Sequence, residues 1–203
     1  MGALLQNFRN TMVVSVFLAL IMIFGFGMHG PDQFGPIFWQ AVTRWAHVFF
    51  GVLWIGLLYY FNFVQIRKMP DIPAELKPAV SKYIAPEALF WFRWAALFTV
   101  LAGLLLAFQR GYIVEVLSLG MAGPQAGAAQ YTLLGAGIWL AIVMFLNVWV
   151  FIWPNQKIAL GLVEADADKK AKAARTAMLF SRTNLLLSLP MLTSMAMYQT
   201  LFN

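Results

Sequence analysis

The chain has 203 residues, of which 62% are hydrophobic and 11% are charged, and its formal net charge is +6. Its apolar residues form runs that are too long for the core of a soluble protein and lack the alternation of a membrane β-barrel. With no cysteine and two histidines, the sequence excludes disulfides, iron–sulfur clusters, covalently attached c-type haem and multi-histidine metal clusters. We therefore expect one all-α, polytopic membrane domain over residues 1–203, without nucleic-acid binding.

Five apolar stretches are long enough to cross a bilayer as helices, which takes about 20 residues. They cover about residues 11–28, 37–66, 88–108, 131–153 and 176–201. Gly30 and Pro31 follow the first stretch and predict its end. Residues 67–87 contain four prolines and predict a polar connector between the second and third stretches.

The second half of the chain carries further signals for helix ends. A short interfacial helix is predicted over residues 112–119, and Pro154 is expected to end the fourth span. Residues 164–175 place acidic side chains before basic ones, which suits the start of a new helix. Pro190 predicts a kink in the fifth span.

The distribution of Lys and Arg predicts the topology. With a cytoplasmic N-terminus, twelve of the 14 basic residues fall on the inner side, and only Arg44 and Arg110 fall on the outer side. Cytoplasmic loops are enriched in Lys and Arg. We therefore expect a multi-pass membrane protein surrounded by lipid, with the N-terminus on the cytoplasmic side and the C-terminus on the outer side.

The second stretch carries unusual polar residues for a membrane span. At 100° per residue, Arg44, His47, Asn62 and Gln65 fall on one stripe of the helix. Polar groups that face lipid are costly. The stripe is therefore expected to face protein, a cofactor or water.

His47 is the first candidate for a binding role, because a buried imidazole is a common axial ligand of haem iron. Gly51 would leave room for a flat macrocycle, Trp54 could stack on it, and Arg44 could pair with a propionate. The alternative is a histidine that makes a hydrogen bond between packed helices. His29, at the end of the first span, is either a second ligand or proton-relay residue, or an ordinary interfacial residue.

Five other polar residues lie inside the predicted spans. They are Asn62, Arg93, Asn147, Arg182 and Asn184. The asparagines are typical of hydrogen bonds between membrane helices. The two arginines either extend to lipid headgroups or reach Asn147 or an anionic substrate group.

Four motifs occur in order along the second to fifth spans. They are Arg44-Trp45-x-His47-x-x-x-Gly51-x-x-Trp54-Ile55-Gly56, Trp91-Phe92-Arg93-Trp94, Asn147-Val148-Trp149 with Pro154-Asn155-Gln156-Lys157, and Ser181-Arg182-Thr183-Asn184 with Leu189-Pro190. Together they resemble the membrane domain of bacterial urate hydroxylase, which is usually fused to a cytochrome c. This chain has Thr183 where that family usually has histidine, and it contains no Cys-x-x-Cys-His motif.

A more distant resemblance concerns His47, Trp54, Gly56 and the Arg182-x-Asn184 pair before Pro190. These residues are similar to those of haem-dependent protoporphyrinogen oxidase and of copper-resistance membrane proteins. The first of these families implies b-type haem on His47. The resemblances together imply a membrane redox protein that passes electrons to a periplasmic cytochrome c or to a quinone.

Two other functions remain open from the sequence. The same scaffold could serve as a non-catalytic accessory or structural subunit of a larger respiratory or photosynthetic membrane complex. A transporter is the third reading, and it is less favoured because no pair of spans shows inverted repetition.

Overall fold

A computed structural model describes residues 2–202, except the side chain of Ala3, and every regular element in that range is helical. The elements are α1 (Gly2–Gln6), α2 (Phe8–Gly27), α3 (Pro36–Tyr59), η1 (Tyr60–Gln65), α4 (Ile66–Lys68), η2 (Met69–Asp71), α5 (Lys77–Ala79), η3 (Val80–Ile84), α6 (Ala85–Gln109), α7 (Ile113–Leu117), α8 (Ala129–Leu146), η4 (Asn147–Ile152), α9 (Trp153–Ala159) and α10 (Ala167–Leu201). η1, η3 and η4 are π-helical, and η2 is a 3-10 turn.

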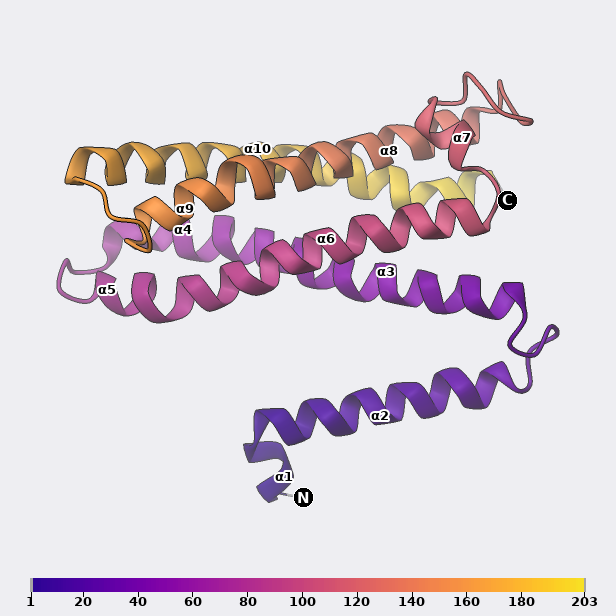
Figure 1. The fold of residues 1–203 in the computed structure, drawn as a ribbon, viewed down its shortest axis with the longest axis horizontal. Coiled ribbons are helices and arrows are strands. Elements are labelled where there is room, and N and C mark those ends of the chain that lie inside the picture. The colour runs from indigo at the N-terminus through magenta and orange to yellow at the C-terminus, as the bar shows by residue number, and fades with distance from the viewer. Residues whose placement is uncertain (1, 203) are drawn as a thin grey trace.

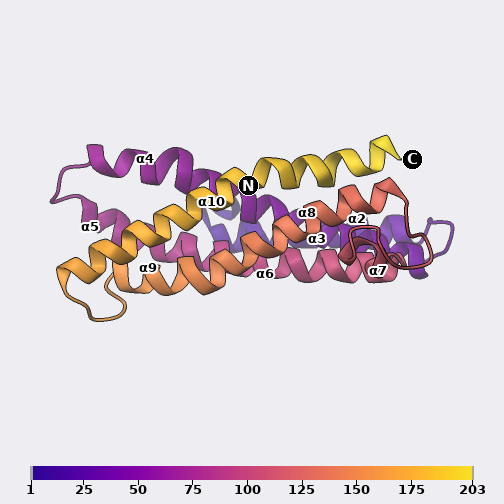
Figure 2. The same cartoon turned by 90° about the horizontal axis from the view of Figure 1, so that it is seen from above.

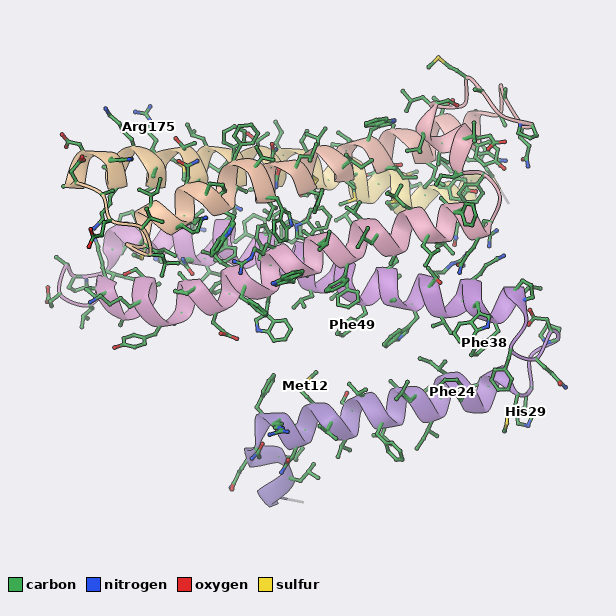
Figure 3. All side chains as sticks on the ribbon, in the orientation of Figure 1. Met12, Phe24, His29, Phe38, Phe49 and Arg175 are labelled. Atoms are coloured by element: carbon green, nitrogen blue, oxygen red, sulfur yellow. The ribbon has the colours of Figure 1, made fainter. Side chains whose placement is uncertain are left out.

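Four long helices form a bundle, and a fifth stands apart from it. Figure 1 shows α3, α6, α8 and α10 in the bundle, with α2 displaced to one side. Ring contacts among Phe24, Phe34 and Phe38 connect the end of α2 to the start of α3 (Figure 3). The ring centroids are 5.0–6.2 Å apart. The core of the bundle is therefore built without α2.

Four helical segments within residues 2–202 are long and apolar enough to cross a membrane. They are Phe8–Gly27, Pro36–Asp71, Lys77–Gln109 and Ala129–Ala159. The all-helical, multi-pass membrane architecture is thereby confirmed. The predicted fifth span belongs to α10, which is 35 residues long but is not among these four segments.

The amino-acid distribution of α10 explains its lower hydropathy. Its buried positions are small or polar: Ala173, Ala177, Ser181, Asn184, Ser188, Met191 and Ser194. Leu186 and Leu189 are 74% and 65% exposed on the outside of the bundle. Figure 2 shows that α10 runs along the length of the bundle. The helix thus turns small and polar side chains towards the bundle and exposes Leu186 and Leu189 on its other side.

The prediction that Pro154 ends the fourth span is wrong. α8, η4 and α9 form one continuous helical segment that passes Pro154 and ends at Ala159. A proline lacks the amide hydrogen and its ring crowds the carbonyl four residues before it. The π-helical turn η4 lies immediately before the proline and shifts the hydrogen-bond register there. Gly161, with a φ of 77°, follows the actual helix end.

The predicted polar connector over residues 67–87 is also mostly helical. Helix continues through Asp71 and resumes at Lys77, so that only residues 72–76 separate the two long segments. Pro78 lies in the first turn of the segment that starts at Lys77. Proline is tolerated there because the amide of a first-turn residue has no helical partner. Pro70 lies near the C-terminal end of the continuous segment Pro36–Asp71, and Pro86 lies inside Lys77–Gln109, after the π-helical turn η3.

The remaining predicted helix signals are largely confirmed. α7 (Ile113–Leu117) is the short helix predicted over residues 112–119. α10 begins at Ala167, earlier than the predicted span, and the Asp166 side chain accepts a hydrogen bond from the Lys169 amide at 2.7 Å. Pro190 lies inside α10 without interrupting it.

Candidate functional site

His47 lies on α3 and makes its hydrogen bond across to α6. Its Nδ1 donates to the carbonyl oxygen of Thr99 at 2.8 Å. A carbonyl can only accept, so Nδ1 carries the proton and Nε2 of the neutral ring keeps a lone pair. A histidine that ligates a metal or accepts a proton is commonly oriented in this way by its other nitrogen.

Gly103 makes this close approach of α3 and α6 possible. A Cβ atom at Gly103 would lie 2.8 Å from Cε1 and 2.9 Å from Nδ1 of His47. A Cβ at Gly51, by contrast, would meet only Thr99 Cγ2 at 3.7 Å. The room predicted beside Gly51 is therefore taken by Thr99, and Gly103 is the glycine that accommodates the imidazole.

A cavity of about 80 Å³ lies beside His47 inside the bundle. Its walls include His47, Thr99, Gly103, Tyr112, Ile138 and Met195. A single water needs roughly 10–15 Å³ of such space, so the cavity holds a few waters or a very small ligand. Pockets for cofactors and drug-sized ligands are typically about 300–1,000 Å³.

Haem b can be tested against these residues. The donor fits, because His47 Nε2 is free and the ring is oriented through Nδ1. The space does not fit, because a cavity of about 80 Å³ does not hold a tetrapyrrole. Trp54, expected to stack on a cofactor, is instead completely buried in the hydrophobic core.

Tyr112 connects the cavity to one end of the bundle. Its ring centroid lies 5.5 Å from that of Tyr131 and 6.4 Å from that of Tyr198. Burial raises the pKa of the Tyr112 phenol above its ordinary value, Tyr198 adds to the rise, and Arg110 and Arg44 oppose it. Arg44 therefore lies near a tyrosine cluster, where it can attract an anion arriving at this end.

We expect the Tyr112 phenol to stay protonated at pH values where exposed tyrosines ionise, about pH 10. Because its folded pKa is raised, the native chain keeps a proton that the unfolded chain releases. Stability should therefore fall as the pH rises from about 10 towards the folded pKa. Ultraviolet titration of the wild type and of Tyr112→Phe isolates this phenol.

Tyr83→Phe provides the control for this titration, because Tyr83 is 77% exposed. Removing this exposed phenol should leave the Tyr112 component unchanged. A Tyr112 component that ionises at the ordinary tyrosine pKa would contradict the prediction.

A second polar group lies deeper in the bundle, where asparagines connect α10 to the neighbouring helices. Asn147 Nδ2 donates to Asn184 Oδ1 at 2.8 Å, and Asn184 Nδ2 donates to the Met144 carbonyl at 2.9 Å. Asn184 is 0% exposed. The prediction of hydrogen bonds between membrane helices is confirmed for this pair.

Asn62, in η1, makes a further polar contact with α10. Its Nδ2 donates to Ser181 Oγ at 3.0 Å and to the Leu58 carbonyl at 2.9 Å. Asn62 and Asn147 both lie in π-helical turns, η1 and η4. Such turns are frequent at functional sites, but sequence patterns with a 3.6-residue period do not reveal them.

The remaining predicted site residues lie elsewhere. His29 follows α2, outside the bundle, where its Nδ1 is 2.8 Å from the Gly25 carbonyl (Figure 3). Arg182 is exposed. Arg93 stacks its guanidinium on Trp153 at 3.7 Å, and within residues 2–202 its side chain makes no hydrogen bond to Asn147 or to any other residue.

No group of three or more His, Asp or Glu side chains that could bind a metal ion occurs in the described part of the chain. No protein-family model, curated protein or solved structure matches this chain.

Proposed function

We propose that the chain is a membrane redox protein of the urate hydroxylase type, in which His47 accepts a proton as the substrate is oxidised. The observation that carries the proposal is the His47–Thr99 hydrogen bond, because it leaves the Nε2 lone pair available beside an internal cavity. The ordered motifs of the second to fifth spans support the same assignment.

The chemistry requires a substrate with an acidic N–H or O–H group. Because the cavity is too small for the substrate itself, that group would pass its proton to His47 Nε2 through water in the cavity, while two electrons leave to a quinone or, one at a time, to a separate periplasmic cytochrome c. Arg44 and Arg110, near Tyr112, would attract an anionic substrate such as urate to this end of the bundle.

Of the features that haem b requires, the site provides only a donor atom, His47 Nε2. His47, with its Nδ1 held by Thr99, would be the residue that holds the iron, and Arg44 would pair with a propionate. A bound haem would supply one-electron transfer. The cavity beside His47 is too small for a tetrapyrrole.

The membrane topology forms part of the proposal. We take α10 as the fifth span, because it buries Ser181, Asn184 and Ser188 and exposes leucines. Five spans and the distribution of basic residues then place the N-terminus in the cytoplasm and the C-terminus in the periplasm of the bacterial inner membrane.

The test uses the full chain in membranes and then in mild detergent. We expect urate-dependent reduction of a quinone analogue or of added cytochrome c, and we expect His47→Ala to lower the rate by about 100-fold or more. His29→Ala is the matched control and should keep the wild-type rate, because His29 lies outside the bundle.

An absorption spectrum of the same preparation separates the two roles of His47. A Soret band that His47→Ala removes would assign it as a haem ligand, whereas a colourless active protein would assign it as the proton acceptor. A folded wild type without urate-dependent electron transfer would contradict the proposed function.

One observation favours a second function, that of an accessory subunit. α2 is buried over only 6% of its span, and a groove of about 480 Å³ lies between it and α3. Its exposed residues include Phe17 and Ile21, at 60% and 52%. Stoichiometric co-purification with respiratory or photosynthetic subunits in the same preparation would favour this function over catalysis.

A further inference from the structure

Two basic side chains lie against the ring of Trp153. The Arg93 guanidinium carbon is 3.7 Å from the ring centroid, and Lys157 Nζ is 5.7 Å from it. Trp153 and Lys157 are one turn apart on α9, and Arg93 reaches them from α6. Cation–π contacts of this kind hold each charge in place, but they do not neutralise it.

The two basic groups lack an acidic partner in the structure. Within residues 2–202 the single salt bridge is Lys68–Asp71, which is exposed. Arg93 Nη1 is buried and has no hydrogen-bond partner among the described residues. A buried guanidinium N–H without an acceptor is costly, and an anionic oxygen is the strongest acceptor it can take.

The Arg93 backbone is also held in place. Trp149 Nε1 donates to the Arg93 carbonyl oxygen at 3.2 Å, and the Trp149 ring meets the Trp94 ring edge-on at 5.6 Å. These contacts join α6 to η4 and orient the face from which Arg93 extends. The guanidinium is therefore positioned before any ligand binds.

Apolar surface adjoins this basic pair. Trp94 stacks on Phe98 at 6.0 Å, and the two rings are 36% and 42% exposed. Leu146 and Val150, on the neighbouring helical segment, are 46% and 54% exposed. The basic pair lies towards the end of the bundle that carries α4, α5 and α9 (Figure 1). A charged group at the end of an apolar surface matches a lipid, with a headgroup and an acyl chain.

We propose that Arg93 and Lys157 bind the phosphate group of one anionic phospholipid, whose acyl chain lies along Trp94 and Phe98. The end of the bundle that holds them is rich in basic residues, including Arg67, Lys68, Lys77 and Lys82 on the adjoining segments. Basic pockets between membrane helices on the cytoplasmic side are suited to anionic headgroups.

Native mass spectrometry of the full chain in mild detergent tests this site. The probes are phosphatidylglycerol and phosphatidylcholine of the same acyl length. We expect one phosphatidylglycerol molecule to be retained with roughly tenfold preference, as for one well-placed charged hydrogen-bond pair. Arg93→Gln combined with Lys157→Gln should remove the preference.

Lys172→Gln combined with Arg175→Gln is the charge-matched control, because both residues lie on exposed turns of α10. This control should keep the preference. Lys157→Gln alone leaves the Arg93 guanidinium unchanged, and it should reduce the preference partially. Circular dichroism confirms that each variant is folded.

Two results would overturn the proposal. One is an unchanged phosphatidylglycerol preference in the folded Arg93→Gln, Lys157→Gln variant. The other is full displacement of the retained lipid by millimolar inorganic phosphate, which would identify a soluble anion as the ligand. Retention of the lipid in the presence of phosphate supports the lipid headgroup.

Discussion

We expect Asn184→Leu to lower the free energy of unfolding by about 2 kcal/mol, which is among the largest single-residue effects in this chain. The substitution removes both side-chain hydrogen bonds of Asn184 and leaves Asn147 Nδ2 buried without that acceptor. A buried group that loses its partner costs about 1–3 kcal/mol. The loss exceeds the average for one hydrogen bond between membrane helices because a buried amide is left unpaired.

The measurement is equilibrium unfolding in mixed micelles, followed by the helical circular dichroism signal. Thr183→Val is the neighbouring control, since Thr183 is exposed and its hydroxyl bonds only to the Leu179 carbonyl of its own helix at 3.1 Å. It should change stability by less than about 0.5 kcal/mol. Equal stability of the Asn184→Leu variant and the wild type would contradict the role of this asparagine.

A double-mutant cycle tests whether Asn147 and Asn184 stabilise the bundle as a pair. Asn147→Leu combined with Asn184→Leu should cost less than the sum of the two single changes, because the two residues share one hydrogen bond. Additive effects would show that the two side chains act separately.

We expect Gly103→Ala to displace His47 and to lower the proposed redox rate by about 100-fold, the effect of losing a positioned acid–base group. The new methyl group would lie 2.8–2.9 Å from Cε1 and Nδ1 of His47, so the imidazole has to move away from the Thr99 carbonyl. Overpacking of this kind also costs about 1–3 kcal/mol of stability.

Two other glycines on α3 provide graded controls for this prediction. A Cβ at Gly56 meets nothing within 4 Å, and one at Gly51 meets only Thr99 Cγ2 at 3.7 Å. Gly56→Ala should be neutral or stabilise the helix by about 0.5–1 kcal/mol, and both variants should keep the wild-type rate. The same loss of rate in all three variants would show that helix propensity is responsible and that contact with His47 is not.

Much of the helix pattern could be predicted because it depends on local composition. Long apolar runs specify membrane helices, and Asp166 before Ala167 specifies a helix start through its side-chain oxygen. The end at Pro154 could not be predicted correctly. A proline normally disrupts a helix, but the π-helical turn before it changes the hydrogen-bond register, and that change has no simple sequence signal.

The candidate site, like the helix pattern, could be predicted from the sequence only in part. The helical stripe predicted that His47 faces protein, a cofactor or water and turns away from lipid, since its period along α3 is a local property. Its partners Thr99 and Gly103 lie about fifty residues away on α6. Their contact depends on how two helices pack, which helical periodicity does not specify.

The sequence by itself determined that this is an apolar, all-helical membrane chain with polar residues on one face of its second span, because hydropathy and helical period are local properties. Only the tertiary structure decided which polar residues meet. It brought His47 into a hydrogen bond with Thr99 and Asn147 into one with Asn184. It also stacked Arg93 on Trp153, where Arg93 has no acidic partner among residues 2–202. It also left α2 outside the bundle, since no local signal states which apolar face another helix will cover.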